Sequence, residues 1–167
     1  MSTEHLLRTP EETAAFGERV GRVLRAGDLV LLSGDLGAGK TTFTRGLATA
    51  LGVRGPVTSP TFVIAREHPS LVGGPVLVHV DAYRLGSLAE VDDLDLDTAA
   101  EEAVTVVEWG RGLVEEIAGD RLEVDLLRPT GAAPSSDGAG AEAEAPVEPR
   151  RAVVRAVGER WAGVDLS

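Results

Sequence analysis

The sequence predicts a three-layer α/β fold, with a mostly parallel sheet and an antiparallel extension at its C-terminal end. Three observations lead to this prediction: short apolar runs alternate with helical patterns, a glycine-rich turn joins the first such run to its helix, and the last two β-like stretches have no helix between them. Such alternation is typical of a parallel sheet with helices on its faces. The length of 167 residues predicts one domain over residues 1–167.

The first helix is predicted to begin at Pro10 and to end near Gly27. Thr9 is a suitable N-cap, Pro10 fits the first helical position, and Glu12 lies three residues after the cap. The apolar residues that follow recur on one helical face. Residues 29–33 are too short and too uniformly apolar for a surface strand, so they predict a buried parallel one.

The later elements continue the alternation. The patterns predict, in order, a helix at 40–51, strands at 76–81 and 104–109, a helix at 113–118, and strands at 121–127 and 152–157. An acidic, low-complexity tract at 129–149 separates the last two strands. It holds one valine and no aromatic residue, so burial cannot offset its ordering entropy. We interpret it as a disordered loop inside an edge hairpin, with a partner-binding segment as the alternative.

Composition narrows the class of protein. The formal net charge of −11 becomes −7 without the four acidic residues of the 129–149 tract, because 23 acidic residues then face 16 basic ones. An acidic body repels phosphate backbones, so direct nucleic-acid binding is not expected. The absence of cysteine excludes disulfides, thiolate metal sites and cysteine nucleophiles. No apolar run approaches the roughly 18 residues that span a bilayer, and no secretory signal is visible. We therefore expect a cytoplasmic protein without membrane contact.

A glycine-rich stretch from Gly34 to Thr41 fits the phosphate-binding pattern G-x-x-x-x-G-K-[ST]. Glycines let backbone N–H groups converge on phosphate oxygens, and the helix N-terminus favours negative charge. Lys40 would reach the β- and γ-phosphates, and the Thr41 hydroxyl would bind Mg²⁺. The alternative is a glycine-rich turn without a ligand. We expect the nucleotide to be bound by Asp35, Leu36, Gly37, Ala38, Gly39, Lys40, Thr41 and Thr42.

Adenine is favoured over guanine as the base of that nucleotide. Guanine recognition of the Ras type uses an Asn-Lys-x-Asp motif, and Lys40 is the only lysine of the chain. The predicted cofactors are therefore ATP and Mg²⁺.

Further candidate site residues follow two of the strands and the second helix. Asp81 closes the strand at 76–81, where it could bind Mg²⁺ or simply form a turn. Glu108 could orient or deprotonate the attacking water. Trp109 could cover the nucleotide, mark a partner surface or cap the core. Thr61 of the Ser-Pro-Thr-Phe segment at 59–62 could sense the γ-phosphate, or the segment could be a rigid turn.

Two other sets of polar residues carry no site prediction. The acidic segment of Asp92, Asp93, Asp95 and Asp97 lacks the glycine and terminal glutamate of an EF-hand loop, so a solvated segment is the better interpretation. The three histidines, His5, His68 and His79, show no metal-ligand spacing.

Four motifs in order resemble the bacterial TsaE family, the ATPase subunit of tRNA threonylcarbamoyladenosine biosynthesis. They are Leu32–Leu47 around the phosphate-binding pattern, Ser59–Phe62, Asp81–Leu85 and Val107–Trp109. The similarity covers about Thr9 to Leu127 and resumes at Arg151. The 129–149 tract departs from the family because it is longer than the expected terminal hairpin, which affects the boundaries of the last strands.

The resemblance implies a small P-loop NTPase domain that acts with a TsaD–TsaB heterodimer and meets tRNA only through that complex. The partners install the threonylcarbamoyl group on the adenosine next to the anticodon, and ATP hydrolysis by the family's subunit is thought to reset them. By motif position, Lys40 and Thr41 hold phosphate and Mg²⁺, and Asp81 holds Mg²⁺. Thr61, Glu108 and Trp109 belong to the hydrolytic or switch region.

Two other functions remain open on the sequence. The same P-loop could serve a small-molecule kinase, although such enzymes usually carry an arginine-bearing lid and the 129–149 tract holds no basic residue. A nucleotide-gated binding module, in which Glu108 has no catalytic role, is the non-enzymatic alternative.

Overall fold

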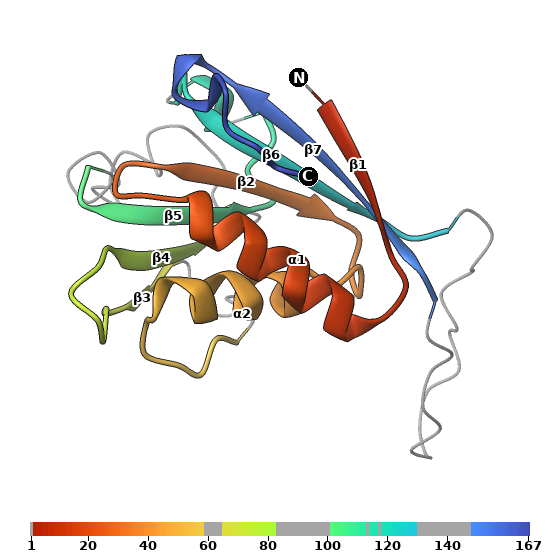
Figure 1. Cartoon of the computed structure of the whole chain (residues 1–167), viewed down its shortest axis with the longest axis horizontal. Helices are drawn as coiled ribbons and strands as arrows, with labels where there is room; N and C mark the ends of the chain where they lie inside the picture. The colour runs from red at the N-terminus through yellow and green to blue at the C-terminus, as the bar shows by residue number, and fades with distance from the viewer. Residues whose placement is uncertain (1, 59–64, 83–100, 113, 117, 130–147) are drawn as a thin grey trace.

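A computed structural model describes residues 2–58, 65–82, 101–112, 114–116, 118–129 and 148–167 (Figure 1). The elements are β1 (Ser2–Leu7), α1 (Pro10–Val23), β2 (Leu29–Gly34), α2 (Lys40–Leu51), β3 (Ala65–His68), β4 (Val76–Asp81), β5 (Ala103–Glu108), β6 (Arg121–Leu127) and β7 (Arg150–Val157), with 3₁₀ turns η2 (Val114–Glu116) and η3 (Glu159–Trp161). The predicted α/β class is confirmed.

The seven strands form one mixed sheet in the order β1-β7-β6-β2-β5-β4-β3. The four central strands, β6, β2, β5 and β4, are parallel to one another. The strands at both edges are antiparallel: β7 and β1 extend the sheet beyond β6, and β3 pairs with β4. The predicted antiparallel C-terminal extension is therefore the β6–β7 hairpin together with β1.

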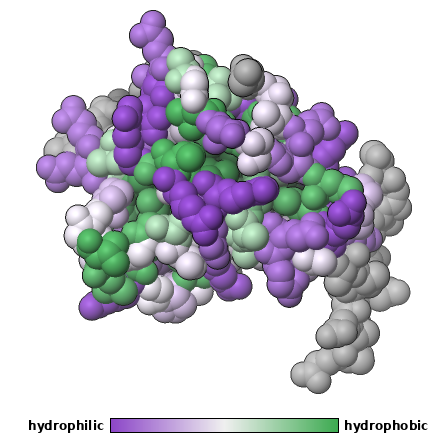
Figure 2. Space-filling model, viewed as in Figure 1, coloured by the Kyte–Doolittle hydropathy of each residue, from purple (hydrophilic) through white to green (hydrophobic). Residues whose placement is uncertain are grey.

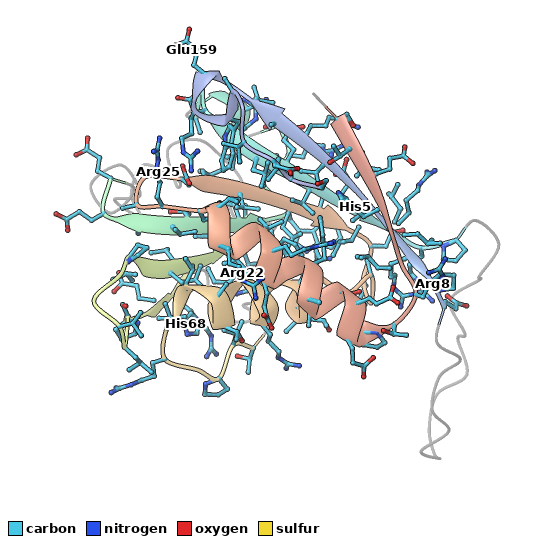
Figure 3. All side chains as sticks on the ribbon, in the orientation of Figure 1. His5, Arg8, Arg22, Arg25, His68 and Glu159 are labelled. Atoms are coloured by element: carbon cyan, nitrogen blue, oxygen red, sulfur yellow. The ribbon has the colours of Figure 1, made fainter. Side chains whose placement is uncertain are left out.

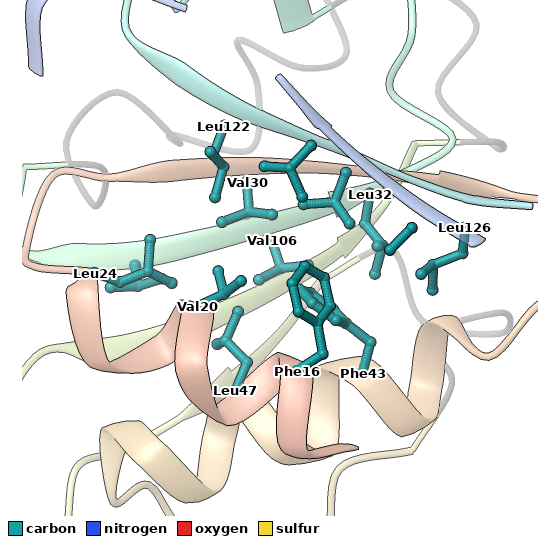
Figure 4. Packing of buried hydrophobic residues seen from close by; sticks show 14 of the residues in the cluster. Phe16, Val20, Leu24, Val30, Leu32, Phe43, Leu47, Val106, Leu122 and Leu126 are labelled. Carbon is teal, nitrogen blue, oxygen red and sulfur yellow. The ribbon is translucent and has the colours of Figure 1, made fainter. Parts of the chain in front are cut away.

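The two α-helices of the described residues, α1 and α2, lie on the same face of the sheet (Figure 1). Phe16 and Phe43 from the two helices pack with Leu32 and other apolar residues of the central strands in the main core cluster (Figure 4). Strand residues alternate between faces, so Leu31 instead joins a second cluster with Val80. Both faces of β2 are buried at Val30, Leu31 and Leu32, and the run from Leu29 to Leu32 is uniformly apolar, as expected for a central parallel strand. The outer side of the helical layer carries many hydrophilic side chains (Figure 2).

Glycines allow the two helices to pack closely. A Cβ on Gly46 of α2 would lie 1.9 Å from the carbonyl oxygen of Ala14, and one on Gly17 of α1 would lie 2.1 Å from that of Phe43. No side chain fits between two backbones at this distance. The close contact keeps α2, and therefore the turn that precedes it, in a defined position against the sheet.

Some predicted elements differ from the observed ones. Within the predicted helix at 113–118 the described residues form only the turn η2, and β5 ends at Glu108 rather than at Trp109. Sequence patterns did not predict β1 or β3, which are edge strands with several exposed residues. The hairpin on both sides of the 129–149 tract is confirmed, but it does not form the edge of the sheet, because β1 pairs with the outer side of β7. Residues 130–147 lie outside the described part. No helix among the described residues is long and apolar enough to cross a membrane.

The three histidines lie on different strands, β1, β3 and β4. His5 on β1 stacks beside Phe16 with ring centroids 4.7 Å apart, and Figure 3 shows His68 in a separate part of the molecule. His79 lies on β4. The described residues contain no group of three or more histidine or acidic side chains that could hold a metal ion.

A buried ion pair joins the C-terminal turn η3 to the connection between α1 and β2. Arg160 in η3 donates to both carboxylate oxygens of Asp28 at 2.8 and 2.7 Å, and also to the carbonyl of Val23 at 2.9 Å. The two side chains are 13% and 5% exposed. We expect Asp28→Ala to lower the free energy of unfolding by about 3 kcal/mol, because it leaves a buried guanidinium without its partner.

Chemical denaturation of the purified variant tests this expectation. The exposed pair of Glu18 and Arg22 on α1 (Figure 3) provides the control, since Arg22→Ala should change the free energy of unfolding by less than about 0.5 kcal/mol. Equal effects of the two substitutions would contradict the proposed importance of the buried pair.

Candidate nucleotide-binding site

The turn between β2 and α2 has the backbone that anion binding requires. Gly37 and Gly39 adopt left-handed conformations with φ of 77° and 103°, which residues with a side chain rarely adopt. Gly39 is the N-cap of α2, and it provides no side-chain cap for the first turn. The N–H groups at this helix end are therefore available to an anion, and the helix dipole favours one.

Lys40 is enclosed at the start of α2, with 9% of its surface exposed. Its ammonium group donates to the carbonyl oxygens of Gly34 at 2.6 Å and Asp35 at 3.3 Å, and lies 4.4 Å from the centroid of the Trp109 ring. Burial lowers the pKa of Lys40, and this effect outweighs the opposing attraction of Glu108, Asp35 and Asp81. A phosphate group in the site would supply the negative charge that favours the ammonium form.

Two buried carboxylates lie beside each other at the carboxyl ends of neighbouring parallel strands. Asp81 on β4 and Glu108 on β5 are register partners and are 4% and 3% exposed. Glu108 also pairs with Leu32, two residues before the end of β2, so the carboxylates lie on the same sheet edge as the phosphate-binding turn.

The oxygen Oε1 of Glu108 makes no hydrogen bond within the described residues and lies 3.5 Å from Nε2 of His79. This separation is long for a hydrogen bond. A buried carboxylate oxygen without a hydrogen bond is available to a cation or a water molecule. Mg²⁺ commonly binds one or two carboxylates together with substrate phosphates and water. Asp81, Glu108 and the Thr41 hydroxyl fit that requirement.

Trp109 has an unusual backbone conformation and separates two cavities. Its φ of 60° makes it the one non-glycine residue with positive φ among the described residues, and its side chain is 42% exposed. Such strain is often found at functional sites. One cavity, of about 280 Å³, is lined by Leu36, Gly37, Ala38, Gly39, Lys40, Thr41, Thr42, Glu108 and Trp109. The other, of about 380 Å³, is lined by Ser33, Gly34, Asp35, Trp109, Arg111, Asp125, Leu126 and Leu127.

The structure brings together most of the site residues predicted from sequence. Seven residues of the phosphate-binding turn and helix start, Leu36 to Thr42, share a cavity with Glu108 and Trp109. Asp35 borders the second cavity and accepts a hydrogen bond from Lys40 through its carbonyl. The exposed ring of Trp109 does not cap the core, so the nucleotide and partner roles remain. Thr61, the segment at 59–62 and the acidic segment at 92–97 lie outside the described residues.

Sequence patterns did not indicate two residues at this site. His79 contacts Glu108, and strand alternation was the available signal, because it places residues 77, 79 and 81 on one face of β4. Arg150, at the start of β7, donates hydrogen bonds to carbonyls of the phosphate-binding turn. No local sequence pattern could indicate these contacts, because Arg150 lies 112 residues after Ala38 and 113 residues after Gly37.

Because Lys40 is the only lysine, amine-reactive labelling read by mass spectrometry reports on this side chain and on the N-terminal amine alone. We expect the labelling rate of Lys40 to give a pKa below the ordinary value of 10.5, because burial disfavours its charged form. Between the lowered pKa and 10.5 the unfolded chain binds more protons, so the contribution of Lys40 to stability rises with pH in that window.

A denatured sample provides the control for the labelling experiment, since its lysine should titrate at the ordinary value. An unchanged pKa in the native protein would contradict the buried environment described for Lys40.

Comparisons with known proteins show which family this chain resembles. The family model described as threonylcarbamoyl adenosine biosynthesis protein TsaE matches residues 7–133. A tRNA threonylcarbamoyladenosine biosynthesis protein TsaE from Streptomyces coelicolor is 57% identical over 153 residues, which cover 91% of this chain and 95% of that protein. The protein of the same name from Bacillus subtilis is 41% identical over 120 residues, covering 71% and 73%. The crystal structure of YdiB from Bacillus subtilis matches with a TM-score of 0.69 and 31% identity, covering 97% of this chain and 90% of that one.

Proposed function

Since this chain belongs to the TsaE family and so has a role in tRNA threonylcarbamoyladenosine biosynthesis, we propose that it binds and hydrolyses ATP with Mg²⁺ as an accessory subunit of that pathway. We further propose that it acts on a TsaD–TsaB complex, which carries out the threonylcarbamoylation of the adenosine next to the anticodon. A tRNA-modification role implies that it works in the cytoplasm.

The main support for this proposal is one arrangement of residues. The N-terminus of α2, which has no side-chain cap and holds the enclosed Lys40, lies at the same sheet edge as the buried carboxylates of Asp81 and Glu108. The helix end and Lys40 provide for the phosphates, and the carboxylates provide for a cation and a water molecule. A turn without a ligand would not explain why the oxygen Oε1 of Glu108 is buried without a hydrogen bond among the described residues, because burying such an atom unpaired is unfavourable.

Each residue has a distinct role in the proposed hydrolysis. Lys40 exchanges its two turn carbonyls for phosphate oxygens, and Gly39 offers its backbone N–H. A bound Mg²⁺ would neutralise phosphate charge, and Thr41 and Asp81 would be its protein ligands. Glu108 is close enough to Asp81 to share the site, and its Oε1 can accept a hydrogen bond from the attacking water, thereby orienting or deprotonating it.

The charge of the chain supports an indirect relation to tRNA. Twenty-seven acidic residues outnumber sixteen basic ones, so the molecule as a whole repels a polyanion. Contact with tRNA is therefore assigned to the partner complex, and this subunit contributes the nucleotide-dependent step.

Phosphate release from Mg·ATP by the purified protein tests the proposal, first alone and then with added TsaD–TsaB and tRNA. We expect slow release by the isolated chain and strong stimulation by the heterodimer. ATP binding without stimulation would reject the accessory-subunit role, and transfer of the phosphate to a hydroxylated acceptor would show a small-molecule kinase instead. Omission of Mg²⁺ should abolish release, because both Asp81 and Thr41 act through the metal.

A further inference from the structure

Arg150 connects the C-terminal hairpin to the phosphate-binding turn. Its Nε donates to the carbonyl oxygen of Ala38 at 3.2 Å, and its Nη2 donates to that of Gly37 at 3.2 Å. Arg150 is the first residue of β7, at the end of the 129–149 tract, whereas Gly37 and Ala38 precede α2. A guanidinium is planar and has several donors in fixed directions, so one side chain can hold two successive carbonyls.

Hydrogen bonds to these carbonyls also determine where the attached N–H groups point. A trans peptide places its C=O and N–H on opposite sides. The bond from Arg150 to the Ala38 carbonyl therefore directs the N–H of Gly39 away from the hairpin. The peptide group between Gly37 and Ala38 is held on both sides. Its carbonyl accepts a hydrogen bond from Arg150, and its N–H donates to the Asp35 carbonyl at 3.0 Å.

Arg150 is itself held in position from the hairpin side. Its Nη1 donates to the carbonyl of Glu148 at 2.9 Å and lies 3.9 Å from the Glu148 carboxylate. The same carboxylate accepts a hydrogen bond from Arg128, at the other side of the hairpin, at 3.3 Å. The Arg150 side chain is only 22% exposed. Its conformation is thus restricted before any ligand arrives, which lowers the entropy lost when the turn is ordered.

We propose that Arg150 is a positioning residue for the nucleotide site: it braces the phosphate-binding turn through the Gly37 and Ala38 carbonyls, so that the N–H of Gly39 is preorganised for phosphate. This inference rests on the proposed function, because it assumes that the turn binds a nucleotide. It adds a residue from outside the P-loop motif and gives the β6–β7 hairpin a part in nucleotide affinity.

Nucleotide affinity of the full-length chain tests the proposal, measured for ADP and ATP with Mg²⁺ by calorimetry. Arg150→Gln should weaken binding about tenfold, because it removes two charge-assisted hydrogen bonds that order the turn. Arg150→Lys should restore part of the affinity, since one ammonium can reach one carbonyl but cannot reproduce the planar pair.

Arg151→Gln is the matched control. It removes the same charge from the next residue, whose side chain is 57% exposed and pairs with Glu4 at 3.7 Å. We expect its affinity to stay within twofold of the unchanged chain. The tenfold difference between the two glutamine variants should persist at high salt, because screening suppresses a long-range charge effect but not a short hydrogen bond.

A second measurement separates positioning from loss of fold. The N–H of Ala38 donates to the Asp35 carbonyl within the braced turn. Amide hydrogen exchange at Ala38 in the nucleotide-free protein should become faster in Arg150→Gln than in Arg151→Gln, while the core amides of β2 exchange as in the unchanged chain. Equal affinities and equal Ala38 exchange in the two variants would overturn the inference. Failure of the unchanged chain to bind ADP or ATP would instead reject the proposed function on which it rests.

Discussion

Lys40→Ala is expected to weaken ATP binding at least about 100-fold, because the ammonium would make charge-assisted hydrogen bonds to two phosphates. The enclosed position of Lys40 leaves no second cation able to replace it from the turn, since the described residues of the phosphate cavity include no arginine and Lys40 is the sole lysine. Calorimetric titration with ATP in the presence of Mg²⁺ measures the loss directly.

The variant should remain folded, which makes the binding result interpretable. Burial lowers the pKa of Lys40, so its charged form is held in the native protein at an unfavourable desolvation energy. Removal of the side chain should therefore leave thermal stability close to that of the unchanged chain. Arg151→Gln serves again as a charge control outside the site. If Lys40→Ala binds ATP as tightly as the unchanged chain, the nucleotide does not bind at this turn and the proposal is rejected.

Glu108→Gln is expected to lower the rate of ATP hydrolysis by about 100- to 1000-fold while ATP binding changes little. Glutamine keeps the size of the side chain and its hydrogen-bonding oxygen but cannot accept a proton from water. The partner-stimulated rate of phosphate release, measured at saturating ATP, reports the catalytic step, and a titration on the same sample reports affinity.

The same substitution distinguishes the enzyme from a nucleotide-gated binding module. In a module without a catalytic role for Glu108, both Glu108→Gln and Glu108→Ala would bind ATP and release phosphate at the unchanged rate. Loss of binding in Glu108→Gln would point to a structural role for the buried carboxylate beside His79. Selective loss of turnover supports the hydrolytic role.

The elements that local sequence signals encode were predicted well. Thr9 accepts a hydrogen bond from the N–H of Glu12 at 3.1 Å, as the N-cap pattern indicated, and α2 begins at Lys40 and ends before Gly52. These features depend on interactions over a few residues, so a short stretch of sequence is sufficient to recognise them. The strands that end at Asp81 and near Glu108 were recognised because buried parallel strands are continuously apolar.

Edge strands and short turns were predicted less well. Within the described part of the chain, β1 and β3 lie at opposite edges of the sheet, where no further strand pairs with one of their sides and several side chains face solvent. Their weak patterns gain stability from pairing with β7 and β4, which sequence periodicity cannot show. The predicted helix at 113–118 has a helical pattern, but the described residues keep only one 3₁₀ turn there.

The sequence by itself determined the glycine-rich turn, the strand before it and the helix after it, because these three features belong to one contiguous motif. Only the tertiary structure decided that Asp81 and Glu108 become register partners at the same sheet edge, and that Glu108 lies beside His79. It also decided that Arg150 meets Gly37 and Ala38. These contacts join residues from separate strands and loops, and the pairing of the sheet and the packing of the hairpin bring them together.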